Sequence, residues 1–532
     1  MHHSELKGEL MTAIDQKIDW QRRTVTRGGI ELAVFELGHR AQDRPTVVLV
    51  HGWPDTHHLW TQMAAELARR YHVVAYDTRG YGESDRPDGD AAYRLPELAA
   101  DLYAVIDTFS PDLPVHVVAH DWGSVQTWEA VSVPGAERRI ASFMSVSGPN
   151  MDHLSVWTRE RLRRPTPKSL AQALSQGLSS AYTVVFQLPV IPKILLSTAI
   201  RPARWQRWLN KLEGTDPDNL DLAPTFRADT ISGLRYYRAN IRERMRKPNP
   251  RSTRVPVFEI VNTRDVALRK AIYVNSHRYV DRLWRNDTPT GHWLPYTNPD
   301  YLANMATQFI ETIRGTASSP IIDRARQDGR HRLLSGKLAV VTGAGSGIGR
   351  RTASLLADNG AEVIVTDIDL TSARRTAATI MSTGNTAHAY ELDVTDSSAF
   401  AAFADDVTRR FGVADLVVNN ADVSVAGQVL DNNVLAVITG SRLFGQRMVD
   451  RGVGGHIVNI SSAGYAAGKA GILMFSETLR TELAEHHIGV SAVCPDQIGE
   501  QLQAMMTDLH RRSGFTPKWL ERLPGRTRSG RA

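Results

Sequence analysis

The chain has 532 residues, which is too many for one hydrophobic core, so we expect two domains. Its 42% hydrophobic and 23% charged residues are typical of globular proteins, with no signal peptide and no apolar run long enough to cross a bilayer. The net charge is +6, but the sequence contains no nucleic-acid-binding motif, so we expect no nucleic-acid partner. The single cysteine excludes an intrachain disulfide, so we expect a cytoplasmic protein.

Strands and helices alternate through the first 130 residues. Alternating residue types from Trp20 to Glu36 predict a hairpin that turns at Gly28. The apolar runs that follow predict buried parallel strands at 46–50, 71–76 and 115–118, with a helix at 95–108 before the last of them. Such alternation is typical of a parallel, doubly wound α/β sheet.

The strand at 115–118 breaks at Asp121 and the chain continues at once as a helix. The small residues Ala119 and Gly123 flank Asp121 and allow the close strand–helix approach of a nucleophile elbow. The aspartate narrows the chemistry, because a carboxylate that attacks an sp³ carbon forms an ester that water can cleave. Taken alone, the pattern also fits an aspartate that only caps the helix.

Residues 151–250 interrupt the alternation. They are rich in Trp, Arg and Pro and predict an inserted helical cap over the sheet. The most apolar stretch is 181–200, where Pro189 and Pro192 exclude a single membrane helix. We expect this stretch to line an apolar substrate tunnel, and shallow peripheral contact with a membrane is the alternative.

An acid and a base follow the cap. Asp265 comes after an expected strand, and His292 lies 27 residues further on. Because loops after parallel strands meet at one edge of the sheet, both side chains should lie beside Asp121. His292 would activate water, and Asp265 would orient the His292 ring. The backbone N–H groups of Trp53 and Trp122 would hold the oxyanion.

These motifs resemble the epoxide hydrolases of the α/β-hydrolase fold. The resemblance covers 20–315 through four motifs in the family's order, His51-Gly-Trp-Pro, Arg79-Gly-Tyr-Gly-Glu-Ser, His120-Asp-Trp-Gly and Gly291-His-Trp. It implies opening of a small-molecule epoxide to a vicinal diol through an Asp121 ester, with no metal or organic cofactor. The apolar cap stretch favours epoxides that are bulky, apolar or fatty. The resemblance also implies that Tyr182 and Tyr237 of the cap protonate the epoxide oxygen. The alternative is a haloalkane dehalogenase, which binds halide through indole or amide N–H donors and lacks the tyrosine pair.

A change in composition predicts a linker at 316–334 and a second domain at 335–532. The glycine-rich turn 342–349 follows a strand, and the next strand ends at Asp367, 20 residues beyond Gly347. The helix N-terminus after such a turn can receive a pyrophosphate. An acid at this spacing suits the adenosine ribose, which favours NAD over NADP. The sequence therefore predicts a Rossmann-type dinucleotide-binding domain.

The glycine spacing resembles the short-chain dehydrogenases/reductases. The resemblance implies cofactor contacts from Gly343, Ser346, Gly347, Ile348, Gly349, Asp367, Asp393, Val394 and Asn420. It implies catalytic roles for Ser462, Tyr465, Lys469 and Asn433. The order of the two domains resembles the two-domain epoxide hydrolase/dehydrogenase proteins of mycobacteria (the D-type paralogue). The motifs leave the oligomeric state open, a homo-oligomer included.

The second half of this domain departs from the dehydrogenase pattern. Asp422 and Asp496 stand where the family has glycine, and Ser462 precedes Tyr465 by only 3 residues, where the family has a longer loop. Three residues reach at most about 10 Å, too little for the loop that forms a wall of the substrate pocket. We expect a domain that binds NAD(P) but is a poor or inactive dehydrogenase. The alternative is a bifunctional hydrolase and oxidoreductase with a relocated serine.

Overall fold

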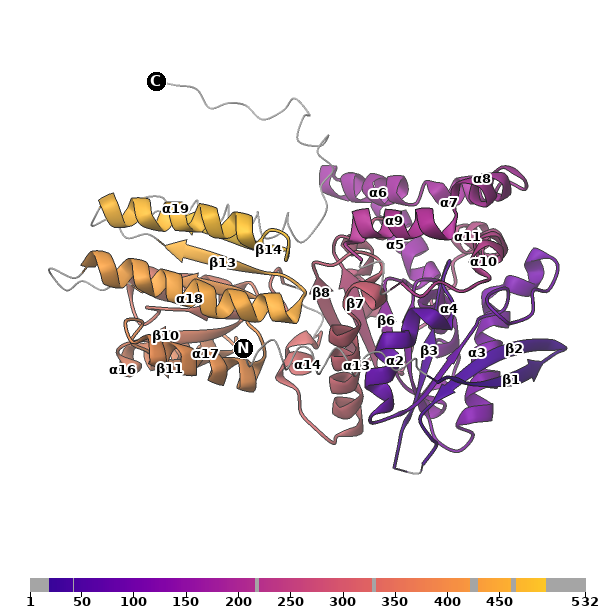
Figure 1. The fold of residues 1–532 in the computed structure, drawn as a ribbon, viewed down its shortest axis with the longest axis horizontal. Coiled ribbons are helices and arrows are strands. Elements are labelled where there is room, and N and C mark those ends of the chain that lie inside the picture. The colour runs from indigo at the N-terminus through magenta and orange to yellow at the C-terminus, as the bar shows by residue number, and fades with distance from the viewer. Residues whose placement is uncertain are drawn as a thin grey trace, which may run out of the picture.

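The computed structural model describes residues 19–493, apart from Gln42, 216–219, 328–331, 422–428 and 461–465. These residues form two sheets, one in each half of the chain, and Figure 1 shows the two halves side by side. Both sheets are mainly parallel, as the alternation of strands and helices predicts.

The first sheet has the strand order β1-β2-β4-β3-β5-β6-β7-β8. β1 and β2 form the predicted antiparallel hairpin, β2 is antiparallel to β4, and the later pairs are parallel. The strands are β1 (Gln21–Arg27), β2 (Ile30–Leu37), β3 (Thr46–Val50), β4 (His72–Tyr76), β5 (Val115–His120), β6 (Ile140–Val146), β7 (Val257–Asn262) and β8 (Leu283–Thr288). Every residue of β3 and β5 is buried, because helices cover the sheet on both sides.

Successive side chains of β3 pack into two hydrophobic cores, one on each face of the sheet. Val47 and Leu49 pack with the helices α2 (Thr61–Ala68) and α13 (Pro299–Arg314), and the short α12 (Leu294–Thr297) joins the same core. Val48 and Val50 pack on the opposite face with α3 (Leu95–Phe109) and α4 (Trp122–Val131). The sheet is therefore held between two helical layers.

Between β6 and β7 the chain builds the predicted helical cap (Figure 1). Its helices are α5 (Met151–Arg163), α6 (Pro167–Ser179), α7 (Tyr182–Phe186), α8 (Ile191–Ala199), α9 (Pro202–Glu213), α10 (Phe226–Ser232) and α11 (Leu234–Arg246).

The apolar stretch 181–200 does not form the expected tunnel lining along its whole length. Phe186 and Leu196 are buried, but Val184, Val190 and Ile194 are 71%, 58% and 57% exposed. The prediction is wrong for this outward side, because α7 and α8 are short helices that can turn only one side toward the protein.

The segment 316–334 is more than a spacer. It contains the helix α14 (Pro320–Ala325), whose Ile322 and Ala325 are buried in the core of the first half. Arg324 of the same helix donates to Glu362 Oε2 at 2.7 Å and to the Phe411 carbonyl at 2.6 Å in the second half. The helix thus contacts both halves.

The second sheet is parallel, with the order β11-β10-β9-β12-β13-β14. Its elements are β9 (Leu338–Val341), α15 (Gly347–Asp358), β10 (Glu362–Asp367), α16 (Leu370–Ser382), β11 (Ala387–Glu391), α17 (Ser397–Phe411), β12 (Leu416–Asn419), α18 (Val429–Arg451), β13 (Gly455–Ile460), α19 (Ala466–Leu483) and β14 (Ile488–Val493). The order reverses between β9 and β12, which is the switch point where doubly wound sheets bind their ligands.

Candidate functional site

The turn between β5 and α4 holds Asp121 in a strained backbone conformation. Its φ and ψ are 50° and −123°, a region that residues other than glycine rarely occupy. Two glycines make the turn fit: a Cβ on Gly123 would lie 2.2 Å from the Val50 carbonyl oxygen, and one on Gly148 would lie 2.4 Å from the Asp121 carbonyl oxygen. The strain directs the Asp121 side chain away from the strand and toward the carboxyl edge of the sheet.

Backbone amides bind the Asp121 carboxylate. Trp53 N–H donates to Oδ1 at 2.8 Å, and Trp122 N–H also donates to the carboxylate. Gly52 permits this approach, since a Cβ there would lie 2.5 Å from Oδ1. Burial raises the pKa of Asp121, against the lowering effect of His292 and the two amides.

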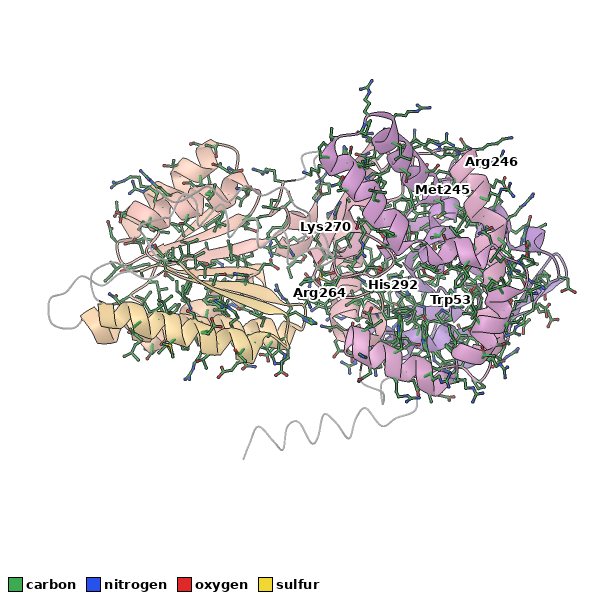
Figure 2. The ribbon with its side chains drawn as sticks, turned by 90° about the horizontal axis from the view of Figure 1, so that it is seen from above. Trp53, Met245, Arg246, Arg264, Lys270 and His292 are labelled. Carbon is green, nitrogen blue, oxygen red and sulfur yellow. The ribbon has the colours of Figure 1, made fainter. Side chains whose placement is uncertain are left out.

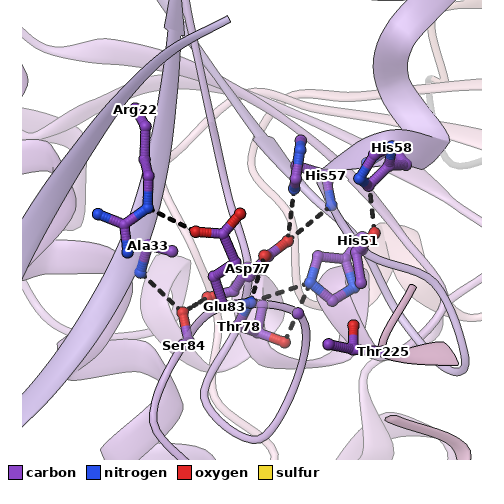
Figure 3. A network of polar contacts seen from close by, with 12 residues as sticks. Arg22, Ala33, His51, His57, His58, Asp77, Thr78, Glu83, Ser84 and Thr225 are labelled. Carbon is purple, nitrogen blue, oxygen red and sulfur yellow. Dashed lines mark hydrogen bonds and ion pairs between the residues drawn. The ribbon is translucent and has the colours of Figure 1, made fainter. Parts of the chain in front are cut away.

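A polar network fixes the loop that carries Trp53 (Figure 3). Asp77 accepts from the ring and the backbone N–H of His57, at 2.8 and 2.9 Å, and from Glu83 N–H at 2.9 Å. His51 Nε2 accepts from Thr78 N–H at 2.9 Å, so its Nδ1 carries the proton and donates to the Gly52 carbonyl. Burial lowers the pKa of His51 to about 4, which keeps this ring neutral.

His292 and Asp265 form a buried pair beside Asp121. His292 Nδ1 lies 2.7 Å from Asp265 Oδ2, and His292 Nε2 lies 3.7 Å from Asp121 Oδ2. Asp265 also accepts from the N–H groups of Ala267 and Leu268, at 2.7 and 2.9 Å. Burial opposes its ionisation, but His292 and these amides outweigh burial and lower the pKa of Asp265.

The charge around His292 determines its protonation. Burial alone would lower the pKa of the ring, but Asp265, Asp121 and Glu213 outweigh burial and raise it to about 9. His292 is therefore protonated at neutral pH in the free protein.

The cap brings Tyr182 and Tyr237 together. Tyr182 lies on α7 and Tyr237 on α11, with their ring centres 6.1 Å apart and their hydroxyls hydrogen-bonded. Burial is the largest cause that raises the pKa of both phenols, and the charge of Asp121 raises it further, so both stay protonated. Tyr182 as a whole is 38% exposed, so this burial concerns its hydroxyl rather than its entire ring.

The neighbouring Tyr236 points elsewhere. Its hydroxyl donates to Thr78 Oγ1 at 3.1 Å and to the Arg79 carbonyl at 2.9 Å, and its ring is buried. The two adjacent tyrosines of α11 thus have different surroundings, and Tyr237 is the one beside Tyr182.

Sequence reasoning missed two carboxylates. Glu213, the last residue of α9, accepts from the N–H of His292 at 3.1 Å and of Trp293 at 3.4 Å. Asp55 is buried and accepts from Trp293 Nε1 and the Tyr296 hydroxyl, both at 3.1 Å, and burial raises its pKa to about 7. Asp55 follows the His51-Gly-Trp-Pro motif, which could have indicated it, but no sequence signal indicates Glu213.

The two groups of labelled residues in Figure 2 face different neighbours. Trp53 and His292 lie beneath the cap, whereas Arg264 and Lys270 lie toward the second half of the chain. Arg264, although adjacent in sequence to Asp265, lines a cavity together with Lys270 and with residues of the second half such as Asp415.

The glycine-rich turn of the second half fits a dinucleotide. Gly343 and Gly347 have φ of 62° and 50°, and a Cβ on Gly347 would meet nothing within 4 Å, which leaves open space before the N-terminus of α15. Ser346 is the N-cap of α15, Ile348 lies in its first turn, and a Cβ on Gly349 would collide with the Gly343 carbonyl oxygen at 2.2 Å. Backbone N–H groups at this helix end can bind phosphate.

Two of the other expected cofactor residues, Asp367 and Asn420, contact this turn. Asp367 Oδ2 accepts from Gly345 N–H at 2.8 Å, and Asn420 Nδ2 donates to the carbonyls of Thr342 and Gly343 at 3.0 and 3.1 Å. Asp393 accepts from Thr395 N–H at 2.9 Å, and Val394 is buried.

The expected catalytic residues of this half are only partly described. Asn433 lies on α18 and is partly buried. Lys469 lies on α19, and its side chain is outside the described part of the structure, as are Ser462, Tyr465, Asp422 and Asp496.

Two further properties concern the described residues only. They contain no group of three or more His, Cys, Asp or Glu side chains that could hold a metal ion. None of their helices combines the length and hydropathy needed to span a bilayer.

Comparisons with known proteins agree with this arrangement. The alpha/beta hydrolase fold family matches residues 45–171, and the short chain dehydrogenase family matches residues 337–508. The "Probable oxidoreductase EphD" of Mycobacterium tuberculosis is 40% identical over 504 residues, covering 90% of this chain and 84% of that protein. These matches confirm the predicted fold classes, an α/β-hydrolase fold followed by a Rossmann-type dehydrogenase fold, and their order.

Two other relatives match the first half alone. Mouse "Epoxide hydrolase 3" is 26% identical over 301 residues, which is 55% of this chain and 77% of that protein. "Epoxide hydrolase A" of Mycobacterium tuberculosis is 33% identical over 186 residues, which is 35% of this chain and 52% of that protein.

Proposed function

The chain belongs to the EphD family of two-domain proteins, in which an epoxide hydrolase-like domain precedes a short-chain dehydrogenase domain, and we propose that its first domain opens epoxides to vicinal diols. One observation carries the proposal: Asp121 is held by two backbone amides, with the His292–Asp265 pair 3.7 Å from its other oxygen. This arrangement places a nucleophile, an oxyanion site and a base next to one another at the carboxyl edge of the sheet.

In the first step, Asp121 Oδ2 attacks a ring carbon of the epoxide. The carbon–oxygen bond of the ring breaks, and Tyr182 or Tyr237 donates a proton to the leaving oxygen. The products are an ester on Asp121 and a free hydroxyl group. Because burial and the charge of Asp121 keep both phenols protonated, they can donate without prior activation.

In the second step, water attacks the ester carbonyl. Ester formation removes the negative charge of Asp121, and this lowers the pKa of His292, which then becomes a base at neutral pH. His292 takes a proton from water, and Asp265 stabilises the resulting imidazolium. The N–H groups of Trp53 and Trp122 hold the oxyanion, and its collapse releases the diol. Before water attacks, the proton that His292 carries in the free protein passes to the tyrosinate, so the ring can accept the first proton of water. The second proton of water goes to the leaving alkoxide, and the cycle ends with Asp121 ionised, His292 protonated and both tyrosines neutral.

The indole N–H groups favour this reaction over halide displacement. Trp53 Nε1 donates to the Thr230 carbonyl at 3.1 Å, and the Trp122 side chain donates to the Tyr237 hydroxyl. Both indoles that could bind a halide ion already have acceptors, so the dehalogenase reaction is the weaker assignment.

A trapping experiment tests the proposal. His292→Gln should complete the first step but not the second, and mass spectrometry should find the Asp121 peptide heavier by the mass of the epoxide. His277→Gln, which changes an exposed histidine, is the matched control and should not accumulate the adduct. Full activity in Asp121→Ala, or an adduct on another residue, contradicts the mechanism.

Substrate size follows from the cap. The Tyr182–Tyr237 pair lies among Trp53, Trp122 and Phe186, whose rings are 4.9 to 6.2 Å from that of Tyr237. This apolar wall favours epoxides with bulky or fatty substituents. A series of epoxides of increasing chain length should show kcat/KM rising with length, and a preference for the smallest would contradict this assignment.

For the second domain, the proposal is NAD(P) binding with weak or absent dehydrogenase turnover. The turn 343–349 and Asp367 would hold the dinucleotide, which when bound supplies hydride transfer. The short spacing between Ser462 and Tyr465 argues against a complete substrate pocket. Alcohol and ketone turnover by the full chain, compared with Tyr465→Phe, tests this, and NAD(P)-linked turnover abolished by the substitution contradicts it.

A further inference from the structure

Exposed apolar side chains are concentrated in one part of the cap. The described residues contain twenty-three large apolar side chains classed as exposed, and fourteen of them lie between Leu162 and Leu212. A soluble monomer rarely exposes a contiguous apolar patch of more than roughly 300–600 Å². This concentration of exposed apolar side chains indicates an interaction surface.

The pattern is set by the helices. On α6, Leu170, Leu174 and Leu178 follow one another at intervals of four and are 40%, 57% and 60% exposed. Residues four apart lie on one side of a helix, so the apolar side of α6 faces outward.

The next helices repeat the arrangement. On α8, Ile191, Ile194 and Leu195 are each more than half exposed, and on α9 Trp208 and Leu212 are 39% and 50% exposed. Figure 1 shows α6, α7 and α8 in a row along the outer edge of the first domain, with α9 next to them.

The same segment has an excess of positive charge. Between Arg161 and Leu212 there are nine Lys and Arg residues and no Asp or Glu. The remaining chain has 54 basic and 57 acidic residues, a formal charge of −3, so this segment accounts for the whole positive excess. Arg204 and Arg207 of α9 donate only to backbone carbonyls among the described contacts, and Lys193 of α8 stands exposed between Ile191 and Ile194.

A surface that is both apolar and cationic matches the interface of a bilayer with anionic lipids. Apolar side chains enter the boundary between head groups and acyl chains, and nearby Lys and Arg bind the lipid phosphates. A second copy of the chain is a poorer partner, because two segments with nine positive charges each would repel.

We propose that helices α6 to α9 form a surface that docks the protein onto a membrane containing anionic lipids. Docking would place α7, and with it Tyr182, at the lipid surface. An apolar epoxide dissolved in the bilayer would then meet the cap directly, a consequence that rests on the function proposed for the first domain.

The test is co-sedimentation of the full chain with vesicles. Phosphatidylglycerol–phosphatidylcholine vesicles should bind the protein at least about tenfold more tightly than pure phosphatidylcholine vesicles, since each cation near an anionic surface adds to the binding. Ile191→Ser with Ile194→Ser, and separately Arg204→Gln with Arg207→Gln, should each weaken binding about tenfold or more.

Matched controls lie in the second domain. Ile368→Ser with Met381→Ser changes two side chains that are 66% and 51% exposed, and Arg374→Gln with Arg375→Gln changes two exposed cations of α16. Neither control should alter vesicle binding, and thermal unfolding should show that every variant is folded.

Three results would overturn the proposal. They are no binding to anionic vesicles, binding reduced as much by the controls as by the cap variants, and concentration-dependent self-association without vesicles that the cap substitutions abolish. The last result would assign the surface to a second copy of the chain. Because sedimentation does not depend on catalysis, failure here leaves the hydrolase mechanism untouched.

Discussion

Removing the charge of Asp121 should change the protonation of His292. The two side chains lie 3.7 Å apart in a buried site, and the pKa of His292 is about 9. At an effective dielectric constant near 20, charges at this separation interact by roughly 4 kcal/mol. Even half of this energy lowers the pKa by about 1.5, toward neutrality. Asp121→Asn, which keeps the shape and removes the charge, should reproduce the electrostatic effect of ester formation.

Nitrogen-15 histidine NMR measures this directly. In the parent protein His292 should titrate near pH 9. In Asp121→Asn it should titrate at least about one pKa unit lower, while His51, whose pKa is about 4 because of burial, stays neutral in both proteins. An unchanged titration of His292 would refute the idea that ester formation switches this residue from a cation to a base.

Three further predictions concern the tyrosines, stability and the cofactor. Tyr182→Phe and Tyr237→Phe should each lower kcat about tenfold and the double variant by at least about 100-fold. Tyr236→Phe, the control, removes the hydrogen bonds to Thr78 and Arg79, so it should lose about 1 kcal/mol of stability but keep its activity. If Tyr236→Phe lowered kcat as much as the other two substitutions, the proton-donor role given to Tyr182 and Tyr237 would be contradicted. The folded pKa of His292 is raised, so its contribution to stability, on the order of 3 kcal/mol, is complete below about pH 6.5 and lost as the pH rises through about 9. Thermal melts should show this loss in the parent protein and not in His292→Gln, whereas parallel curves would contradict the assignment. Asp367→Ala should weaken NAD(H) binding in calorimetry about tenfold, because its carboxylate lies beside the glycine turn, and Asp369→Ala, which removes only the N-cap of α16, should not. NADP(H) binding tighter than NAD(H) binding in the parent protein would reverse the role given to Asp367.

The proximity of Asp121, Asp265 and His292 was predictable from the sequence. The elbow, the acid and the base occur in one order along the chain, and parallel strands bring their following loops to the same edge of the sheet. Their proximity therefore follows from topology. The protonation state of His292 cannot be predicted in this way, because it depends on distances to Asp121 and Glu213 that no motif specifies.

Two long-range pairings beside the site were beyond sequence reasoning. Glu213 reaches the backbone of His292 across 79 residues, and Asp55 reaches Trp293 across 238. Neither pair has a recognisable spacing, since such contacts depend on how α9 and the loop after β3 pack in three dimensions.

The outward side of the cap shows most clearly what only the tertiary structure decided. The sequence determined that 181–200 is apolar and broken by prolines, and it left a tunnel and a membrane surface as alternatives. Helical periodicity identifies which side chains share a face, but it does not say whether that face meets protein or solvent. The packed structure settles this for α8, where Leu196 is 6% exposed and Ile194 is 57% exposed, because the core beneath the helix has room for only one of its sides.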